Sequence, residues 1–334
     1  MISIKLENLS LEIEFKMNIR KTEELKKAFK GKVEFGIPMN RFTYYRIGGK
    51  TWAMVFPENL DDISEAVSFC KKNKIPYLPI GKGSNLLVSD RGFNGVVINL
   101  AKAFNRFQIL DNSESGYKWI FSQGGANLPL MIRELGNEGI GNLEFACGIP
   151  GTVGGGIKGN AGSFNKCISD RLEKLQVVDS EGNIKELPKK DISFGYRTCG
   201  LPKGYIIAGA WFKLKKKKKQ TIDRIISRYQ KIRKLSQPCH ALTAGCVFKN
   251  PQGYSAGKLI ELSGFKGAQC GDARISTKHA NFIINEGRAR AKEVYKLICD
   301  IRKKIWENFG IRLELEIVLV GEGFKDSSRS RSDG

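Results

Sequence analysis

The chain has 334 residues, of which 41% are hydrophobic and 27% are charged, and its 56 Lys and Arg against 34 Asp and Glu give a formal net charge of +22. This composition excludes wholesale disorder, and the length predicts about two domains. The positive charge is compatible with a nucleic-acid partner, an acidic membrane surface or an anionic small substrate, and equally with solvated lysine.

Membrane insertion, secretion and metal binding are not expected. No apolar run approaches the roughly 20 residues that span a bilayer, and the first twenty residues lack the continuous apolar segment of a secretory signal. None of the eight cysteines forms a CxxC pair, which favours reduced thiols and a cytoplasmic protein. The chain has only two histidines, so a histidine-rich metal site is excluded.

The first part of the chain mixes helical spacing with short β-rich runs that Gly, Asn and Asp interrupt. Residues 1–36 are interpreted as a leader element. The glycine-dense stretch 148–162 has seven glycines in fifteen residues and is predicted to form no regular element. The expected elements are helices at 22–29, 60–74 and 128–139, strands at 77–80, 86–88, 96–100 and 205–214, and a hairpin at 177–187.

The second part of the chain begins after a lysine run, Lys213 and Lys215 to Lys219, which is interpreted as a solvated strand end or linker. An amphipathic helix is predicted over 221–235, because isoleucines recur there on one face. The main domain boundary is placed at 215–240. Beyond it we expect a tail of small polar residues at 322–334 to be disordered, preceded by helices at 256–263 and 291–309 and strands at 282–285 and 314–320.

Two glycine-rich loops carry the first chemical signal, one over 81–85 and the other over 148–155. Glycine lets backbone N–H groups approach an anion closely, and successive N–H groups form an anion-binding nest. Two such loops suit a pyrophosphate held from two sides. Neither loop is a Rossmann or Walker A motif, which disfavours a conventional dinucleotide fold.

Four further clusters contain reactive side chains, and each has a structural alternative. The arginine of the first cluster can be a structural ion-pair residue, and the cysteine of the second can be a small buried hydrophobic residue. The histidine of the third can be a hydrogen-bonded structural residue, and the glutamates of the fourth can face solvent from a strand. None of the four decides a function alone. They are Phe194–Arg197, Gly245–Pro251, Lys278–Asn281 and Leu313–Ile317.

Taken in order, these motifs resemble the UDP-N-acetylenolpyruvoylglucosamine reductase family. The resemblance starts at Asn40 and covers most of the chain. The short segment after FGYR resembles the compact form of the family, which lacks an inserted substrate-covering loop. The motifs that carry it are NRFTYYRIGG, GKGSNLLVSDRGFNGVVI, GIPGTVGGGIKGNAG, FGYR, GCVFKNP, KHANFIIN and LELEIVLVGE.

The resemblance implies an α+β fold. It implies an FAD-binding domain of the vanillyl-alcohol-oxidase/PCMH type over 37–215, a linker helix over 216–240 and a smaller α+β substrate-binding domain over 241–321. It also implies an oxidoreductase that uses NADPH and non-covalent FAD to reduce UDP-N-acetylglucosamine enolpyruvate to UDP-N-acetylmuramate in peptidoglycan synthesis. We expect a monomer with no nucleic-acid or membrane partner.

Site residues follow from the same resemblance. Arg197 and Glu316 correspond to the pair that stabilises the enolate of the substrate, and Cys246 to the proton donor. Substrate contacts are expected from Tyr196, Lys249, Asn250 and His279. FAD contacts are expected from Arg46, Gly81, Lys82, Gly83, Ser84, Asn85, Gly148, Ile149, Gly151, Thr152, Gly154, Gly155, Asn160 and Ala161.

The chain departs from the family pattern at two positions. The proton donor of the family is typically serine, and here it is Cys246; a thiol has an ordinary pKa of about 8.5, so it can give up a proton far more readily than an alcohol. The proline usual before the catalytic glutamate is Leu315 here.

Two other functions stay open. One is another FAD oxidoreductase of the same fold that acts on a small alcohol or hydroxy acid, although the lack of histidine before His240 argues against a histidine-linked flavin. The other is a basic nucleic-acid-binding protein, although its lysine run is not interleaved with aromatic residues.

Overall fold

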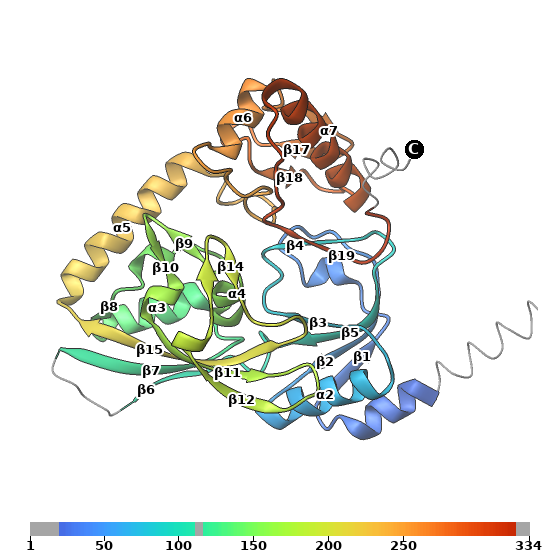
Figure 1. Cartoon of the computed structure of the whole chain (residues 1–334), viewed down its shortest axis with the longest axis vertical. Coiled ribbons are helices and arrows are strands. Elements are labelled where there is room, and N and C mark those ends of the chain that lie inside the picture. The colour runs from blue at the N-terminus through green and yellow to red at the C-terminus, as the bar shows by residue number, and fades with distance from the viewer. Residues whose placement is uncertain (1–19, 111–115, 325–334) are drawn as a thin grey trace, which may run out of the picture.

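The computed structural model describes residues 20–110 and 116–324. Its two largest sheets lie in the lower part of Figure 1, with a smaller helical and stranded part above them. The first sheet has the spatial order β1-β2-β5-β3, in which β5 runs parallel to both neighbours and β1 is antiparallel to β2. Its strands are β1 (Lys32–Phe35), β2 (Thr51–Phe56), β3 (Tyr77–Ile80) and β5 (Phe93–Asn99).

Helix α2 (Leu60–Lys72), a helix that its apolar spacing predicted, packs on this sheet. The Asn59 side chain accepts a hydrogen bond from the Asp62 amide and caps the first turn. Buried side chains of the helix join those of the strands in one core cluster. The cluster includes Ile63, Ala66, Val67, Cys70, Ala53, Val55, Val96 and Ile98.

The second sheet is antiparallel and has the order β12-β11-β15-β7-β6, with β8 also paired to β15. Its long central strand β15 extends the predicted strand at 205–214 by two residues. Strands β11 and β12 form the predicted hairpin, with Gly182 at φ +94° in its connection. The strands are β6 (Phe107–Leu110), β7 (Tyr117–Gln123), β8 (Ile140–Gly141), β11 (Leu172–Val178), β12 (Ile184–Pro188) and β15 (Ile206–Lys216).

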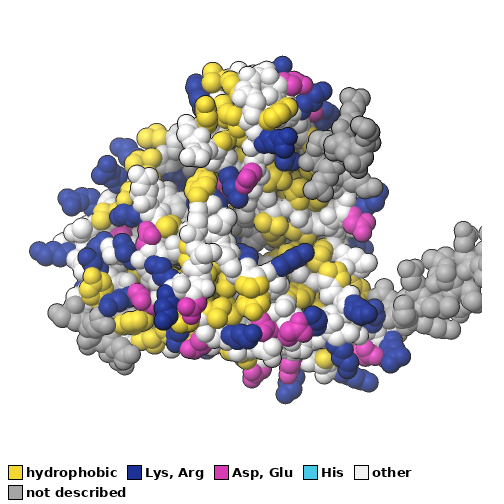
Figure 2. Space-filling view, viewed as in Figure 1, with side chains coloured by type: hydrophobic (Ala, Val, Ile, Leu, Met, Phe, Trp, Pro, Cys, Tyr) yellow, Lys and Arg dark blue, Asp and Glu magenta, His cyan; other side chains and the backbone are white. Residues whose placement is uncertain are grey.

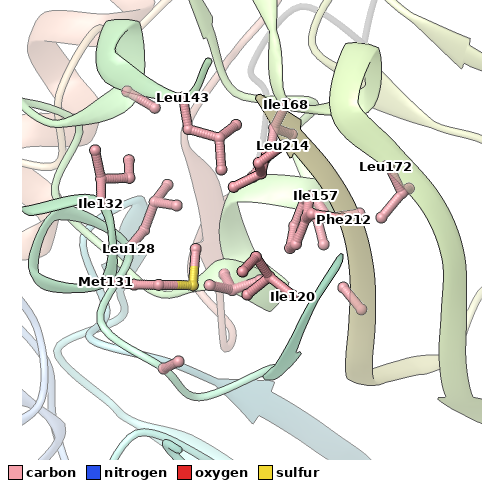
Figure 3. Packing of buried hydrophobic residues seen from close by; sticks show 14 of the residues in the cluster. Ile120, Leu128, Met131, Ile132, Leu143, Ile157, Ile168, Leu172, Phe212 and Leu214 are labelled. Atoms are coloured by element: carbon pink, nitrogen blue, oxygen red, sulfur yellow. The ribbon is translucent and has the colours of Figure 1, made fainter. Parts of the chain in front are cut away.

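Helix α3 (Leu128–Asn137) covers the second sheet with an apolar face. Figure 3 shows side chains of this helix packed near side chains of β7 and β15 in a buried hydrophobic core. The labelled residues at this contact are Leu128, Met131 and Ile132 from the helix, and Ile120, Phe212 and Leu214 from the strands.

The prediction that 148–162 holds no regular element is wrong. Residues Val153–Lys158 form a short helix, α4. The Thr152 side chain caps it, and the glycines fit because the helix backbone passes close to its neighbours: a Cβ on Gly154 would lie 3.0 Å from the Gly124 carbonyl oxygen. Close approach of the Gly124 backbone therefore explains Gly154, whereas a Cβ on Gly155 would lie no closer than 3.4 Å to its nearest neighbour.

The predicted linker helix is α5 (Lys219–Ser236), which runs from the second sheet to the upper part of the molecule (Figure 1). There a three-stranded antiparallel sheet packs with two helices around a separate core cluster. The sequence predicted both helices and one of the strands. The elements are α6 (Ala256–Leu262), β16 (Gln269–Cys270), β17 (Ala273–Ile275), β18 (Ile283–Asn285) and α7 (Ala291–Phe309).

The last strand returns to the lower part of the chain. β19 (Val318–Val320) pairs in parallel with β4 (Leu86–Val88), and the two lie together in Figure 1. The predicted strand at 314–320 is thus correct only for its second half. Before it, Leu315 forms a single bridge to Phe248, because this segment crosses between the two parts of the molecule.

Short elements fill the connections. Strand pairs β9–β10 and β13–β14 are two-residue hairpin arms. The short elements are β9 (Gly162–Ser163), β10 (Lys166–Cys167), β13 (Phe194–Gly195), β14 (Thr198–Cys199), and the 3-10 turns η1 (Met39–Arg41), η2 (Glu144–Ala146), η3 (Ile168–Arg171) and η4 (Lys189–Asp191).

At the N-terminal end, residues 20–28 are helical and the leader element continues into the first sheet through β1. Thr22, where the predicted helix was expected to begin, therefore lies inside the helix. At the other end, Phe324 packs edge-on against Tyr295, with ring centroids 5.2 Å apart. Most of the predicted disordered tail lies outside the described residues. The limits of the domains stay a prediction.

The lysine run is only partly a solvated surface. Lys217 forms an ion pair with the buried carboxylate of Glu144, at 2.6 Å. Lys219 pairs with Asp223 on the same helix, at 2.6 Å. Among residues 20–110 and 116–324, no helix is both long and apolar enough to cross a bilayer.

Candidate active site

A glutamate and an arginine from distant parts of the chain meet where the upper and lower parts of the molecule face each other. The Nε atom of Arg197 lies 2.8 Å from Oε1 of Glu316, and the two side chains are 24% and 21% exposed. Nη1 of Arg197 also donates to the carbonyl of Gly162, at 3.0 Å. The guanidinium is therefore held from two directions while it keeps further N–H groups.

Arg197 sits in the two-residue turn between β13 and β14, with φ at +56°. A non-glycine residue in this left-handed region costs roughly 1–2 kcal/mol. The turn is held by the Asn160 side chain, whose Nδ2 donates to the carbonyl of Gly195 at 2.9 Å. This backbone conformation directs the guanidinium to Glu316. A strained backbone of this kind is typical of functional positions.

Glu316 is fixed by its backbone. Its N–H donates to the carbonyl of Val247 at 2.8 Å, and its carbonyl accepts from Nδ2 of Asn85 at 3.0 Å. Burial raises the pKa of the Glu316 carboxyl above its ordinary value, and the positive charges of Arg197 and Lys249 oppose that shift. The carboxyl therefore holds a proton more readily than an exposed glutamate does.

Cys246 lies beside this pair. Burial raises the pKa of its thiol to about 12, the negative charge of Glu316 adds to the rise, and Arg197 and Arg233 oppose it. A thiol with this pKa is protonated throughout the neutral range. It can act as an acid that is regenerated after each turnover, and it is a poor nucleophile in its resting state.

Arg233 is a site residue that the sequence analysis missed. It lies in the last turns of α5. Burial lowers the pKa of its guanidinium, and the nearby Cys246 and Arg197 also affect this pKa. A Cβ on Gly148 would lie 2.8 Å from Cδ of Arg233, so this glycine makes room for the arginine. The sequence analysis could not single out Arg233, because it is one of several basic residues on the polar face of an amphipathic helix and such residues usually face solvent.

The two glycine-rich loops touch each other. The Ser84 hydroxyl donates to the carbonyl of Pro150 at 2.9 Å. A Cβ on Gly81 would overlap the Thr152 hydroxyl, and one on Gly83 would overlap the carbonyl oxygen of Phe42. These glycines therefore allow one compact two-loop structure. That both loops serve one ligand stays a prediction.

The backbone N–H groups of the two loops are used differently. Those of Val153, Gly154 and Gly155 donate to Ala126, Gly124 and Thr152 at 2.9, 2.8 and 3.3 Å and hold α4 in place. Within residues 20–110 and 116–324, the N–H groups of 82–85 donate to no protein acceptor. Four successive N–H groups of this kind fit an anionic group such as a pyrophosphate.

Three of the predicted substrate residues lie beside the Arg197 turn. The Tyr196 hydroxyl accepts from the Asn250 amide at 3.3 Å, which joins the turn to the upper part of the chain. Nζ of Lys249 lies 3.2 Å from the Glu314 carboxylate. Oδ1 of Asn250 accepts from the Ala256 amide at 3.0 Å, which leaves its NH₂ group for another acceptor.

His279 does not join the cluster. Its Nδ1 accepts from the Asn281 amide at 3.3 Å, and its ring stands edge-on to Phe282, at a centroid distance of 5.0 Å. Burial lowers the pKa of its imidazole. In the described part of the chain, no hydrogen bond or ion pair joins it to Arg197, Cys246 or Glu316.

The other predicted cofactor residues have mixed surroundings. Arg46 is exposed and has φ at +53°. Asn160 and Ala161 support the β13 turn and α4, since the Ala161 amide donates to the carbonyl of Gly156 at 2.7 Å. The Ile149 amide donates to the carbonyl of Ala146, at 2.9 Å.

Comparisons with known proteins identify the family to which the two parts of the chain are similar. An FAD-binding-domain family model matches residues 52–188, and a model of the C-terminal domain of UDP-N-acetylenolpyruvoylglucosamine reductase matches 237–320. The reductase of Clostridium botulinum is 38% identical over 286 residues, which cover 85% of this chain and 91% of that protein. The reductase of Desulforamulus reducens is 38% identical over 300 residues, 90% of this chain and 97% of that one.

The chain belongs to the UDP-N-acetylenolpyruvoylglucosamine reductase family. A solved structure supports this assignment: the crystal structure of UDP-N-acetylenolpyruvylglucosamine reductase from Thermus caldophilus matches with a TM-score of 0.74 and 35% identity, covering 87% of this chain and all of that one. The predicted family and the predicted α+β fold with an FAD-binding domain are therefore confirmed. The family match also settles the choice between this reductase and another FAD oxidoreductase of the same fold.

Membership in the reductase family indicates that the ligand of the two glycine-rich loops is FAD. Both loops, 81–85 and 148–155, lie inside the range that the FAD-binding-domain model matches. The free N–H groups of 82–85 in the first loop and the mutual contact of the loops fit the pyrophosphate of FAD. The predicted cofactors, FAD with NADPH as reductant, are those of this family. The individual contact residues stay a prediction.

Proposed function

We propose that the protein reduces UDP-N-acetylglucosamine enolpyruvate to UDP-N-acetylmuramate, with NADPH as the reductant and non-covalent FAD as the carrier of the hydride. The observation that carries this proposal is the Arg197–Glu316 pair, which stands beside the protonated thiol of Cys246. A guanidinium can bind the carboxylate of an enolpyruvyl ether, and a protonated thiol can donate the proton that its reduction needs.

Arg197 is proposed to bind the carboxylate of the enolpyruvyl group. A guanidinium presents paired N–H donors that match a carboxylate. When hydride reaches the β-carbon, negative charge builds on the α-carbon and on that carboxylate. A fixed guanidinium stabilises this charge without reorganisation, because the carbonyl of Gly162 and Glu316 already orient it.

Glu316 is proposed to keep Arg197 oriented and to hydrogen-bond the developing enolate in its protonated form. A negatively charged carboxylate next to an enolate would repel it. Burial raises the pKa of Glu316, which shifts its carboxyl toward the neutral, hydrogen-bonding form, although Arg197 and Lys249 oppose this shift.

Cys246 is proposed to protonate the α-carbon. FAD held by the two glycine-rich loops would supply the hydride for the β-carbon of the double bond. The S–H bond of Cys246 breaks as the C–H bond at the α-carbon forms, and the double bond becomes a single bond. The thiolate left behind lies near Arg197 and Arg233, whose charges stabilise it until it recovers a proton from solvent.

The first glycine-rich loop is proposed to hold the FAD pyrophosphate through the amides of 82–85, with the second loop closing the other side. The loop is tied to the catalytic glutamate, because Asn85 donates to the carbonyl of Glu316 and accepts from the amide of Val318. Loading of the cofactor and positioning of the glutamate would then depend on one another.

The decisive experiment is NADPH oxidation by the purified yellow protein with and without UDP-N-acetylglucosamine enolpyruvate. We expect substrate-dependent oxidation with formation of UDP-N-acetylmuramate, identified by mass spectrometry. We also expect acid to release the flavin into the supernatant. A flavoprotein that oxidises NADPH at the same rate without the enolpyruvyl substrate would overturn the proposal.

We infer further that the protein acts as a cytoplasmic monomer without a nucleic-acid or membrane partner. Figure 2 shows Lys and Arg side chains dispersed over the visible face instead of gathered in one patch. Within the lysine run, Lys217 and Lys219 are neutralised by Glu144 and Asp223. Size-exclusion chromatography with light scattering, and a DNA-binding assay at several salt concentrations, test these points.

A further inference from the structure

The sequence motif Lys278–Asn281 ends in a buried amide side chain. Asn281 is 2% exposed, and its carboxamide pairs with both backbone groups of a single residue. Its Oδ1 accepts from the Phe248 amide at 2.9 Å, and its Nδ2 donates to the Phe248 carbonyl at 2.8 Å. The side chain of Asn281 therefore takes the place that a neighbouring strand would have beside Phe248.

The backbone of Asn281 holds the next residue toward Cys246. Its carbonyl accepts from the Val247 amide at 2.8 Å. Val247 and Phe248 are each 1% exposed, so a hydrogen bond lost here leaves a buried polar group without a partner. Three hydrogen bonds thus tie one buried residue to the two residues that directly follow Cys246.

The opposite edge of the same segment is held by the residues around Glu316. The Val247 carbonyl accepts from the Glu316 amide at 2.8 Å, and the Lys249 amide donates to the Glu314 carbonyl at 2.9 Å. In an extended chain, the backbone groups of successive residues point to opposite sides. The segment that carries Cys246 therefore lies between the Glu316 segment on one edge and Asn281 on the other.

His279 supports Asn281 from behind. Its Nδ1 accepts from the Asn281 amide at 3.3 Å, and its own amide donates to the Ser276 hydroxyl at 3.3 Å. A Cβ on Gly257 of α6 would lie 3.0 Å from Cε1 of the histidine, so the ring packs against that helix. The histidine of the motif thus contacts the backbone of Asn281, which in turn contacts the segment of Cys246.

We propose that Asn281 is a positioning residue for proton transfer, which fixes the backbone that carries the Cys246 thiol relative to Glu316. The inference rests on the proposed function, in which Cys246 is the acid. An acid must lie within hydrogen-bond reach of the atom that it protonates. A displacement of about 1 Å can cost about 10²-fold in rate, so a strand held on one edge only is a poor support for such a group.

The test compares Asn281→Ala with Asn285→Ala in the FAD-loaded protein. Asn285 is the matched control because it is also buried, at 5% exposed, and also bonds to backbone at both ends of its carboxamide. Its Nδ2 donates to the Tyr45 carbonyl and its Oδ1 accepts from the Ala289 amide, each at 2.9 Å. It forms neither of these bonds with the segment of Cys246.

Anaerobic stopped-flow absorbance measures the two half-reactions separately. In Asn281→Ala, flavin reoxidation by the enolpyruvyl substrate should be about 10- to 100-fold slower. Flavin reduction by NADPH needs no proton from Cys246 and should stay within about two-fold of wild type, as should both half-reactions in Asn285→Ala. Equal slowing of the two half-reactions in Asn281→Ala, or equal effects of the two substitutions, overturns the inference.

An additional variant covers the case in which Asn281→Ala does not fold. Asn281→Asp keeps the size of the side chain and the acceptor for the Phe248 amide, and it loses the donor to the Phe248 carbonyl. The same split between the two half-reactions is expected of it, and equal rates in wild type and Asn281→Asp would then overturn the inference.

Alkylation of Cys246 by N-ethylmaleimide, followed by peptide mass spectrometry, provides a readout that needs no substrate. A segment released on one edge exposes its thiol more often, so alkylation should be about ten-fold faster in Asn281→Ala and unchanged in Asn285→Ala. An unchanged alkylation rate in Asn281→Ala overturns this inference alone. A wild-type protein whose reduced flavin is not reoxidised by the enolpyruvyl substrate contradicts the proposed function instead.

Discussion

The guanidinium Nε of Arg197 lies 2.8 Å from the Glu316 carboxylate, and this contact joins a tight turn of the lower part of the molecule to the segment that returns from the upper part. The turn strains the arginine backbone, and the glutamate holds its side chain. Both residues are fixed through their backbones before any ligand arrives, through the β13–β14 hairpin and through the bond from Glu316 to Val247. Such preorganisation is what stabilisation of a developing carbanion requires.

Replacing Arg197 with lysine should lower kcat about 10²- to 10³-fold, because one ammonium cannot present the paired donors of a guanidinium. Reduction of the flavin by NADPH should continue at a near-normal rate, as followed by stopped-flow absorbance. Arg312→Lys is the control, since Arg312 stacks on Trp306 with its guanidinium 4.9 Å from the ring centroid. An equal loss in both variants would contradict the role of Arg197.

Cys246→Ala should lower turnover by roughly 10²- to 10⁴-fold, the usual contribution of a general acid. The flavin should still be reduced by NADPH in the first half-reaction, and its reoxidation by the enolpyruvyl substrate should be the slow step. Cys246→Ser should keep substantial turnover, because a hydroxyl can fill the same position and donate a proton. Normal turnover in Cys246→Ala would show that another group is the acid.

The raised pKa of Glu316 has a consequence for stability. The folded protein binds the carboxyl proton more tightly than the unfolded chain does, so the native state holds more protons between the ordinary pKa of 4.5 and the raised value. The stabilisation from this group is complete below the ordinary pKa and is lost as pH rises through the raised pKa.

Urea unfolding of the holoprotein across this pH range measures the effect. Glu316→Gln, which imitates the protonated carboxyl, should remove this part of the pH dependence. Glu314→Gln serves as the control, because the Glu314 side chain is 75% exposed. An identical pH dependence in wild type and Glu316→Gln would refute the assignment.

Gly81→Ala should lower the amount of FAD that copurifies with the protein, because its Cβ would overlap the Thr152 hydroxyl and force the two loops apart. The flavin-to-protein absorbance ratio measures the effect. The matched control is Gly159→Ala, whose Cβ would lie 3.7 Å from the nearest atom, an ordinary contact. Equal flavin content in the two variants would mean that the loop contact does not shape the cofactor site.

Lys217→Met should destabilise the fold by about 3 kcal/mol, because it leaves the buried carboxylate of Glu144 without its partner. Burial alone would raise the pKa of Glu144, but the hydrogen bonds from Lys217 and from the Asn142 amide lower it overall. The pair therefore stabilises the fold above the ordinary pKa of Glu144, and this contribution is lost as pH falls through the lowered value.

Thermal unfolding at neutral pH tests this prediction. Lys218→Met, at the exposed neighbouring position, should change stability by less than about 0.5 kcal/mol. Adding Glu144→Leu to Lys217→Met should restore part of the loss, since the unpaired charge is then gone.

The sequence by itself determined the local elements whose pattern repeats within a few residues. Helix α2 and the strands β3 and β4 follow from apolar spacing and from the Gly, Asn and Asp that end them. Recognisable motifs in order also identified the family and selected Arg197, Cys246 and Glu316. The spacing and the motifs are properties of short stretches of sequence. They can therefore be recognised without knowing which other segments pack against them.

Only the tertiary structure decided which distant segments meet. It placed Arg233 beside Cys246, paired β19 with β4, and turned one lysine of a basic run, Lys217, into the partner of a buried carboxylate. The apolar repeat of a helix predicts which of its faces is buried. It does not predict which basic residue on the other face is covered by another part of the chain. That depends on contacts across the chain, and these exist only once the elements have packed.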